Sequence, residues 1–350
     1  MEKLLTLAVP TYNMEKYLAR CLDSVLCENR DYLEVLVVND GSKDNSSVIG
    51  HEYESKYPNV IRAIDKENGN YGSCVNRALA EAKGKYFRML DADDWCETDA
   101  LDQWLEKLKT CDADMILTIS EDRGEDYQLY QRMEAPLSVI PNKVYPLQEF
   151  DGLKLGYKYL YCSHIVTYKT EILRAIGLTL PHGISYTDNE YVYFPMHHCK
   201  SVVYYDLPIY QYFVGREGQT TDPKVMAKSV NQLMTVFDKI WEDFNKKKSK
   251  QILSITNNQR ILLSEMIWWI YRACFSGVNP NQMLTVVESI EARILSDEII
   301  REHVYSREYL RYGFDVLHYY HRTGRFVNHP ITKIKLQIHR IIRFVLRKVK

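Results

Sequence analysis

The chain has 350 residues, and its 45 Lys and Arg residues almost balance its 46 Asp and Glu residues. Hydrophobic residues make up 46% of it, an ordinary globular composition that excludes a disordered, collagen-like or coiled-coil chain. The length suits one larger domain with a smaller appendage. We expect no nucleic-acid partner.

The eight cysteines are scattered without C-x-x-C pairs, which predicts reduced structural thiols and a cytoplasmic protein. The first residues lack the charged segment and the long apolar run of a signal peptide, so we expect no export by that route. No run reaches the roughly 18 apolar residues that a membrane-spanning helix needs.

From residue 4 to about 118, short apolar runs alternate with amphipathic stretches. They predict strands at 4–9, 33–38, 60–64, 86–90 and 115–119, and helices at 15–27, 46–56, 72–83 and 98–109. This alternation is typical of βαβ units, so we predict an α/β fold with a mostly parallel sheet flanked by helices. Ligands of such sheets bind beyond the carboxyl ends of the strands.

The rest of the chain is less regular and then helical. Short Tyr-rich strands are predicted at 157–161, 202–205 and 209–213, followed by helices at 223–245, 250–275, 281–295 and 298–322. We therefore predict a first domain at 1–220, a helical domain at 221–330 and a separate C-terminal helix at 331–350.

Three carboxylates, Asp91, Asp93 and Asp94, directly follow the fourth predicted strand. In an extended segment Asp91 and Asp93 point to the same side, and Mg²⁺ is usually held by one or two carboxylates plus substrate phosphates. The alternative is a capping cluster for the next helix, but Thr98 and Asp99 already serve that purpose. We predict a divalent cation, Mn²⁺ or Mg²⁺, at these aspartates, with the choice between Asp93 and Asp94 as the direct ligand left open.

Polar clusters also follow the first two predicted strands, with Tyr12 in one and Asp40 in the other. An aromatic ring at Tyr12 can stack on a nucleobase, which contributes about 1–3 kcal/mol. The carboxylate of Asp40 can accept hydrogen bonds from a base or a ribose, while Gly41 permits the chain to reverse. The alternatives are a half-buried core edge at Tyr12 and an Asx turn at Asp40 that caps the next helix.

These segments together resemble the family 2 glycosyltransferases of the GT-A fold, in particular those that make bacterial cell-surface polysaccharides. The matching motifs are Val9-Pro10-Thr11-Tyr12-Asn13, Asn39-Asp40-Gly41-Ser42-x-Asp44, Asn68-Gly69-x-x-Gly72-Ser73-x-x-Asn76, Gly84-Lys85-Tyr86-Phe87 and Leu90-Asp91-Ala92-Asp93-Asp94-Trp95. The resemblance covers roughly residues 3–220 and implies a GT-A catalytic domain there, with a Rossmann-like sheet.

The resemblance implies an inverting transfer of a sugar from a nucleotide-diphosphate sugar, usually a UDP-sugar, to a carbohydrate or lipid-linked acceptor hydroxyl. The donor-binding residues it implies are Pro10, Tyr12 and Asp40 for the base and Asn68 and Asn76 for the nucleotide and sugar phosphate. In the family's DxD motif the final acid binds the metal and the first contacts the ribose or sugar, which assigns these roles to Asp93 and Asp91. Arg77 departs from the family pattern and receives no role.

The family also carries an acidic pair further along the chain, and the second acid is the general base. Thr187-Asp188 occupies this place, so the resemblance makes Asp188 the catalytic base and Glu190 the substitute candidate. An inverting displacement needs one carboxylate to take the proton of the acceptor hydroxyl, which fits Asp188. The alternative for Asp188 is an N-cap of the following helix.

Three further features are weaker. Arg216 lies in a Gly-rich loop that in the family often closes over the donor diphosphate, so it is expected to contact phosphate; a solvated surface loop is the alternative. His197 and His198 are adjacent on a helix and point in different directions, so we do not expect a metal pair. His164 is expected in the core or in the acceptor pocket.

The segment 331–350 has isoleucines and valines on one helical face and most of its basic residues opposite. This pattern predicts an interfacial helix on an anionic membrane, which would place the protein at the inner face of the cell membrane. Packing on its own domain or a dimer contact are the alternatives. The sequence leaves the oligomeric state open.

Two other functions compete with sugar transfer. A nucleotidyltransferase also needs paired acids and a metal, but it would usually carry a Gly-rich basic loop where this chain has Pro10 and Tyr12. A non-catalytic nucleotide- or carbohydrate-binding module could use the same fold. The presence of Asp91, Asp93 and Asp188 argues against such a decayed enzyme.

Overall fold

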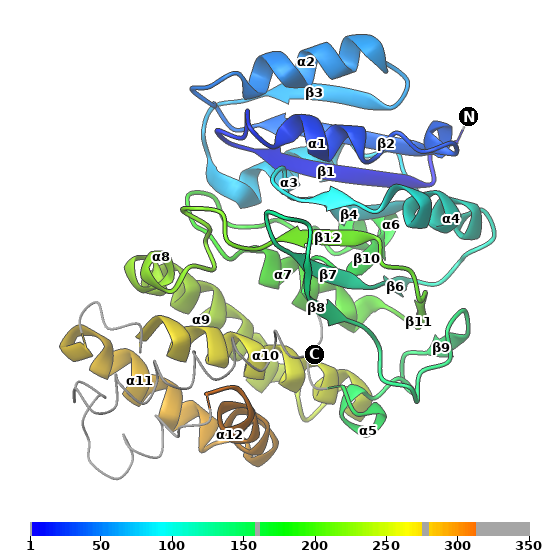
Figure 1. Ribbon diagram of the computed structural model, residues 1–350. Coiled ribbons are helices and arrows are strands. Elements are labelled where there is room, and N and C mark those ends of the chain that lie inside the picture. Colours follow the sequence, from blue (N-terminus) through cyan, green and yellow to red (C-terminus); the bar gives the residue numbers. More distant parts are fainter. Residues whose placement is uncertain (1, 158–161, 275–279, 313–350) are drawn as a thin grey trace. The chain divides into compact units, whose positions relative to one another are not determined.

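A computed structural model describes residues 2–157, 162–274 and 280–312 of the chain (Figure 1). These residues form two compact units, the first with residues up to 217 and 238–259, the second with 218–237 and the described residues from 260 onward. The predicted helix at 331–350 lies outside the described residues, and so does most of the strand predicted at 157–161. The C-terminal ends of the helical domain predicted at 221–330 and of the helix predicted at 298–322 also lie outside them.

Unit 1 is built on a sheet in the order β3-β2-β1-β4-β10-β6-β11-β9. Its strands are β1 (Leu5–Thr11), β2 (Leu33–Asn39), β3 (Ile61–Asp65), β4 (Tyr86–Met89), β6 (Met115–Leu117), β9 (Val144–Pro146), β10 (Val166–Lys169) and β11 (Ser201–Tyr204). β10 and β9 run antiparallel to their neighbours, and the remaining neighbours are parallel. The predicted mostly parallel sheet flanked by helices is confirmed (Figure 1).

The helices of unit 1 connect these strands. They are α1 (Leu18–Asp23), α2 (Ser46–Lys56), α3 (Asn70–Glu81), α4 (Thr98–Leu108), α5 (Gly152–Leu155), α6 (Thr170–Ala175) and α7 (Asp188–Tyr193), with 3-10 turns at Arg30–Tyr32 and Pro195–His198. α1 is shorter than the helix predicted at 15–27, because Ser24 bonds across to another strand. Its hydroxyl donates to the Cys21 carbonyl at 2.6 Å and accepts from the Cys96 N–H at 3.0 Å.

Both faces of the central strands are buried, as is typical of parallel sheets between two layers of helices. Because side chains alternate along a strand, Leu5, Leu7 and Val9 of β1 share one face. They belong to the same apolar core as Leu101 and Trp104 of α4. α3 packs against β1 and β2, and α2 packs against β2 and β3.

A smaller sheet holds the segment after β4. Its order is β5-β12-β7-β8, with β5 (Trp95–Cys96), β7 (Ser120–Arg123), β8 (Leu129–Met133) and β12 (Tyr210–Phe213). β12 pairs antiparallel with β5 and parallel with β7. The acidic segment at 91–94 therefore lies beside a strand more than a hundred residues away in the sequence.

The described part of unit 2 is helical. The last helices among the described residues are α8 (Pro223–Lys228), α9 (Val230–Lys247), α10 (Leu253–Cys274), α11 (Pro280–Ile294) and α12 (Glu298–Tyr312). α9 and α10 each contribute residues to both units. The single helix predicted at 223–245 is two helices, because Ser229 leaves the helical conformation with a φ of −109°. Within unit 2, Arg260 pairs with Asp297 at 3.0 Å.

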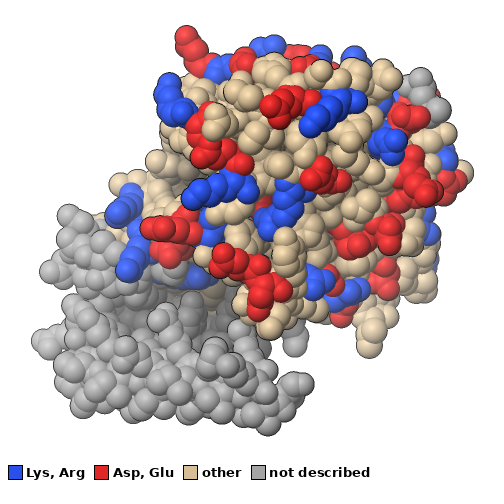
Figure 2. All heavy atoms as spheres, turned by 45° about the horizontal axis from the view of Figure 1, so that its top comes forward, with Lys and Arg blue, Asp and Glu red and all other residues tan. Residues whose placement is uncertain are grey.

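Acidic and basic side chains are interspersed over the face in Figure 2, in line with the near-neutral composition. Among the helices that the structure describes, none is both long enough and apolar enough to pass through a bilayer.

Candidate active site

The tips of β1 and β2 are joined by direct hydrogen bonds. Asn13 adopts a left-handed φ of 54°, and its backbone N–H donates to the Ser42 hydroxyl at 3.0 Å. Its side-chain oxygen accepts from the Lys43 N–H at 2.8 Å. The two predicted polar clusters therefore converge, with Pro10 at the end of β1 and Tyr12 on the surface, 46% exposed. This exposure disagrees with the alternative of a half-buried core edge at Tyr12.

Asp40 fixes the N-terminus of α3. Its two carboxylate oxygens accept hydrogen bonds from the backbone N–H groups of Gly69 and Asn70, both at 2.9 Å. Lys66 forms an ion pair with the same carboxylate, and the side-chain amide of Asn68 donates to the Asp40 carbonyl at 2.9 Å. Asp40 thus binds the N-terminus of α3. The alternative from the sequence was a cap on α2, the helix that directly follows Asp40.

Asn76 connects α3 to the segment that precedes α7. Its side chain accepts from the Leu180 N–H at 2.8 Å and donates to the Leu180 carbonyl at 2.9 Å. A Cβ atom at Gly72 would lie 2.4 Å from the Pro181 carbonyl oxygen, so only glycine permits this close approach. The amide of Asn76, predicted to line the donor site, is engaged in positioning the segment that leads to Asp188.

Asp94 is fully buried and holds β12 in place. One carboxylate oxygen accepts from the Tyr210 hydroxyl at 2.6 Å, and the other accepts from the Phe213 N–H at 2.7 Å. Burial, followed by the charges of Asp93 and Asp91, raises the pKa of Asp94 well above its usual range. The Tyr210 hydroxyl also accepts from the Asp91 N–H at 3.1 Å, so one tyrosine binds both ends of the acidic segment.

Asp93 pairs with Arg216. Nε of Arg216 donates to Oδ2 of Asp93 at 2.6 Å, and the Asp93 carbonyl accepts from the guanidinium of Arg20 at 2.6 Å. Burial, followed by the charge of Asp91, raises the pKa of Asp93, and Arg216 opposes this shift. The loop that carries Arg216 therefore lies against the acidic segment, as a phosphate-contacting residue would require.

Asp91 has one oxygen that bonds a tyrosine and one that faces an imidazole. The Tyr71 hydroxyl donates to Oδ1 at 2.8 Å, and Nε2 of His164 lies 3.8 Å from Oδ2. The His164 ring is stacked between those of Tyr210 and Tyr212, with centroids 4.4 and 4.7 Å away. Burial, then the charges of Asp91 and Asp188, raises the pKa of Tyr71.

Asp188 is the first residue of α7, and the structure assigns the N-cap to Thr187, so the alternative of Asp188 as the N-cap is wrong. Burial, followed by the charge of Asp91, raises the pKa of Asp188 to about 6, while His164 lowers it. Glu190 is fully buried and pairs with Lys239 of α9 at 2.6 Å, which commits the substitute base to another contact.

Three side chains could hold a cation. Ligand atoms of Asp91, Asp94 and His164 all lie within 4.8 Å of one another. Two carboxylates and an imidazole suit Mn²⁺, and a cation would also relieve the repulsion among the buried acids. The residues present therefore fit a divalent cation, with Asp94 rather than Asp93 in the group.

Comparison with known proteins identifies the family of this domain. Residues 6–177 match the family described as Glycosyl transferase family 2. Residues 6–177 form a family 2 glycosyltransferase domain. The putative glycosyltransferase EpsH of Bacillus subtilis is 28% identical over 214 residues, a match that spans 59% of this chain and 60% of EpsH.

Solved structures share the fold of this chain. S. aureus TarS in complex with UDP-GlcNAc has a TM-score of 0.59 at 19% identity, with 93% of each chain covered. The mannosyltransferase PcManGT from Pyrobaculum calidifontis, in complex with GDP-Man and Mn²⁺, has a TM-score of 0.53 at 16% identity, with 89% of this chain and 85% of that chain covered. These likenesses confirm the predicted GT-A fold.

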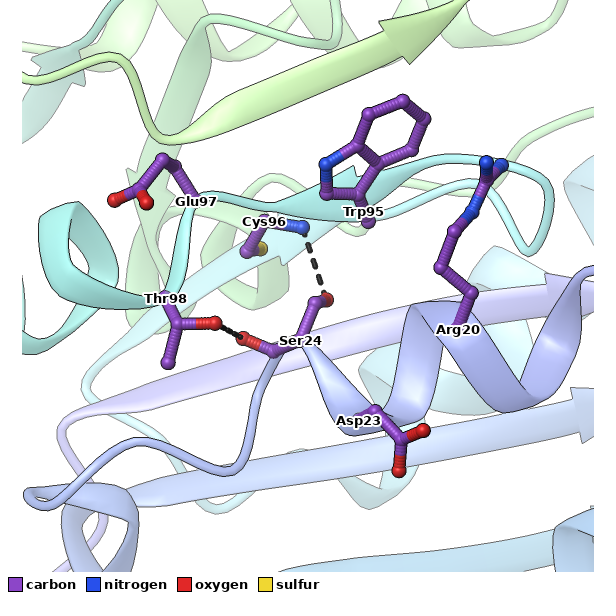
Figure 3. Close-up of a pocket in the computed structure, with 7 residues that line it drawn as sticks. All are labelled: Arg20, Asp23, Ser24, Trp95, Cys96, Glu97 and Thr98. Atoms are coloured by element: carbon purple, nitrogen blue, oxygen red, sulfur yellow. Dashed lines mark hydrogen bonds between the residues drawn. The ribbon is translucent and has the colours of Figure 1, made fainter. Parts of the chain in front are cut away.

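The family 2 domain also has a surface pocket of about 520 Å³ (Figure 3). Its lining residues come from α1, β5 and the start of α4, and are Arg20, Asp23, Ser24, Trp95, Cys96, Glu97 and Thr98. The guanidinium of Arg20 lies 4.1 Å from the centroid of the Trp95 ring. None of the predicted donor or metal residues lines this pocket, so we assign it no part in donor binding.

Sequence reasoning gave no role to Tyr71 and Arg20 of the family 2 domain. Tyr71 occupies an unspecified position of the motif Asn68-Gly69-x-x-Gly72, so the motif itself gave no signal for it. Arg20 had none, because it bonds the backbone carbonyl of Asp93, which any residue could supply. His197, expected not to bind metal, is 2.7 Å from the side-chain nitrogen of Gln259.

Proposed function

We propose that this family 2 glycosyltransferase transfers a sugar, with inversion, from a nucleotide-diphosphate sugar to an acceptor hydroxyl. A UDP-sugar is the first choice of donor, and the acceptor is a carbohydrate or a lipid-linked saccharide. One observation carries the proposal: the charge of Asp91 raises the pKa of Asp188 and that of His164 lowers it, which supports an interaction of the predicted base with the acidic segment.

In this proposal Asp188 accepts the proton of the acceptor hydroxyl. The acceptor oxygen forms a bond to C1 of the sugar while the bond from C1 to the diphosphate oxygen breaks. The electron pair of that bond leaves with the nucleoside diphosphate, and attack from the opposite side inverts C1. A pKa of about 6 leaves Asp188 mostly ionised at neutral pH and still basic enough to take a proton.

The other predicted residues are assigned to the donor. Pro10, Tyr12 and Asp40 would contact the base, with Asn68 beside them, and Asp91 the ribose or sugar, as the family resemblance implies. Asn76 would act indirectly, because its amide is bonded to Leu180.

A divalent cation held at Asp91 and Asp94, with Asp93 as the further candidate, would neutralise the departing diphosphate. Arg216 would contribute a charged hydrogen bond to the same phosphates. The three aspartates and Arg216 already lie together, which supports this assignment.

The experiment is a panel of nucleotide sugars incubated with the protein, with Mn²⁺ or with EDTA. We expect slow, Mn²⁺-dependent release of a nucleoside diphosphate from the correct donor. Release of pyrophosphate from a nucleoside triphosphate would support a nucleotidyltransferase instead, and no release would favour a binding module. Family membership supports the transferase over both alternatives.

With a lipid-linked acceptor, we propose that the protein binds peripherally to the inner face of the cell membrane. The residues that would bind the membrane, 331–350, lie outside the described part of the chain, so this stays a prediction from the sequence. Sedimentation with vesicles containing anionic lipid tests it, because a chain that ends at 330 should no longer bind. Equal sedimentation of both chains would contradict the prediction.

A further inference from the structure

We propose that His164 is a direct nitrogen ligand of the divalent cation, together with Oδ2 of Asp91. This inference rests on the proposed function, because it concerns the cation of the same site. It adds a ligand from outside the acidic motif, since His164 lies in the segment before β10.

The separation of the two groups is that of ligands sharing one ion. Nε2 of His164 and Oδ2 of Asp91 are 3.8 Å apart, too far for a hydrogen bond. Two ligands at about 2.1 Å from one cation lie about 3 Å apart when adjacent and about 4 Å apart when opposite. The gap between these two atoms therefore fits a bridging cation.

The imidazole is fixed in orientation. Its ring lies between those of Tyr210 and Tyr212, with interplanar angles of 11° and 29°. Tyr210 is itself held by its hydrogen bond to Asp94. A ligand that is already oriented loses little conformational freedom when it binds a metal, so this stacking favours metal binding.

The backbone of His164 is fixed as well. Arg88 of β4 is buried, donates to the His164 carbonyl and also donates to the Thr118 hydroxyl at 2.8 Å. Burial lowers the pKa of this guanidinium. We infer that Arg88 is a positioning residue, because its contact places the residue that carries the imidazole.

Asp91 is more exposed than the two acids that follow it. Asp93 is paired with Arg216, whereas Asp94, the other acid of the candidate cation group, is oriented by two hydrogen bonds. Oδ2 of Asp91 faces His164, while its other oxygen bonds Tyr71. A nitrogen ligand makes the site favour Mn²⁺ over Mg²⁺, because Mg²⁺ prefers oxygen ligands.

The test is electron spin-echo envelope modulation of Mn²⁺ bound to the protein with UDP. We expect a ¹⁴N coupling typical of a directly bound imidazole in the wild type. His164→Phe keeps an aromatic ring between the two tyrosines but has no ligand nitrogen, so this coupling should disappear. The Mn²⁺ affinity of this variant should fall at least roughly tenfold, the loss that follows removal of even an outer-shell partner of a metal ligand.

His198→Asn is the matched control, because His198 is exposed and lies outside the site. It should keep both the coupling and the affinity, and thermal unfolding confirms that each variant is folded. A wild-type spectrum without ¹⁴N coupling, no Mn²⁺ binding, or unchanged affinity in His164→Phe would overturn the inference.

Turnover separates this inference from the proposed function. Mn²⁺-dependent release of nucleoside diphosphate without ¹⁴N coupling would reject His164 as a ligand and leave the transferase intact. A clear ¹⁴N coupling without release from any nucleotide sugar would reject the proposed function and leave the metal ligand in place.

Discussion

Nε of Arg216 lies 2.6 Å from Oδ2 of Asp93, which joins the loop after β12 to the acidic segment after β4. If Arg216 contacts the donor diphosphate, Arg216→Ala removes a charged hydrogen bond of about 1.5–3 kcal/mol. UDP should then bind about tenfold to a hundredfold more weakly by isothermal titration calorimetry. Arg301→Ala, at the surface pair of Arg301 with Glu298, is the control and should leave UDP affinity unchanged. Equal affinity in Arg216→Ala and the wild type would contradict the phosphate contact.

The pKa of Asp188 predicts how the rate depends on pH. Burial raises this pKa to about 6, and only the ionised carboxylate can accept a proton. Below about pH 6, kcat/KM should therefore fall roughly tenfold for each pH unit, and it should level off above pH 7. The rate is measured between about pH 5 and 8 with the folded fraction checked at each pH. A rate that stays constant down to pH 5 would exclude Asp188 as the base.

Gly72→Ala should disturb the segment that leads to Asp188. The added Cβ would lie 2.4 Å from the Pro181 carbonyl oxygen, so the backbone must shift. Such overpacking costs about 1–3 kcal/mol of unfolding free energy, and kcat should fall because the segment before Asp188 moves.

Gly50→Ala is the matched control for Gly72→Ala. It also lies in a helix, but its Cβ would meet Val37 and Ala63 at ordinary distances of 3.4 and 3.5 Å. This variant should be neutral or slightly more stable, because alanine favours a helix by roughly 0.5–1 kcal/mol over glycine. Urea unfolding and kcat measure both variants. Equal stability and equal rates in the two would contradict the close approach at Gly72.

Tyr210→Phe should destabilise the acidic segment without removing the ring that stacks on His164. The variant loses a donor to the buried Asp94 at 2.6 Å and an acceptor for the Asp91 N–H at 3.1 Å. We expect a loss of about 1–3 kcal/mol in the free energy of unfolding. Tyr127→Phe is the control, because the Tyr127 ring is exposed, and its free energy of unfolding should match that of the wild type. Equal free energies of unfolding in Tyr210→Phe and the wild type would contradict the role of Tyr210.

Much of the fold followed from the sequence, because apolar runs and polar tips repeat with a clear period. The fully buried β2 is an example, since its run of leucine and valine fits only a strand covered on both faces. Departures arose where tertiary hydrogen bonds outweigh periodicity. Ser24 bonds Cys96 across to β5 and helps to end α1 early, and Ser229 divides a predicted helix in two.

The sequence predicts members of the candidate site but not their contacts. The motif resemblance predicts Asp91 and Asp188 as site residues, and the charges of both raise the pKa of Tyr71, a residue that received no role from the sequence. Adjacent acids in a sequence cannot reveal which carboxylate faces inward, so the burial of Asp94 required the structure. The contacts of His164 also required the structure, because Tyr210 and Tyr212 lie in β12, far from His164 in the sequence.

The central claim is that Asp188 acts on the acceptor while the donor is held by other residues. Its most direct test is UDP-sugar binding by isothermal titration calorimetry to Asp188→Asn in the presence of Mn²⁺, beside the wild type. The account predicts nearly unchanged donor affinity in a variant whose transfer rate falls by roughly a hundredfold or more. Collapse of donor affinity in Asp188→Asn, or transfer at the wild-type rate, would contradict it.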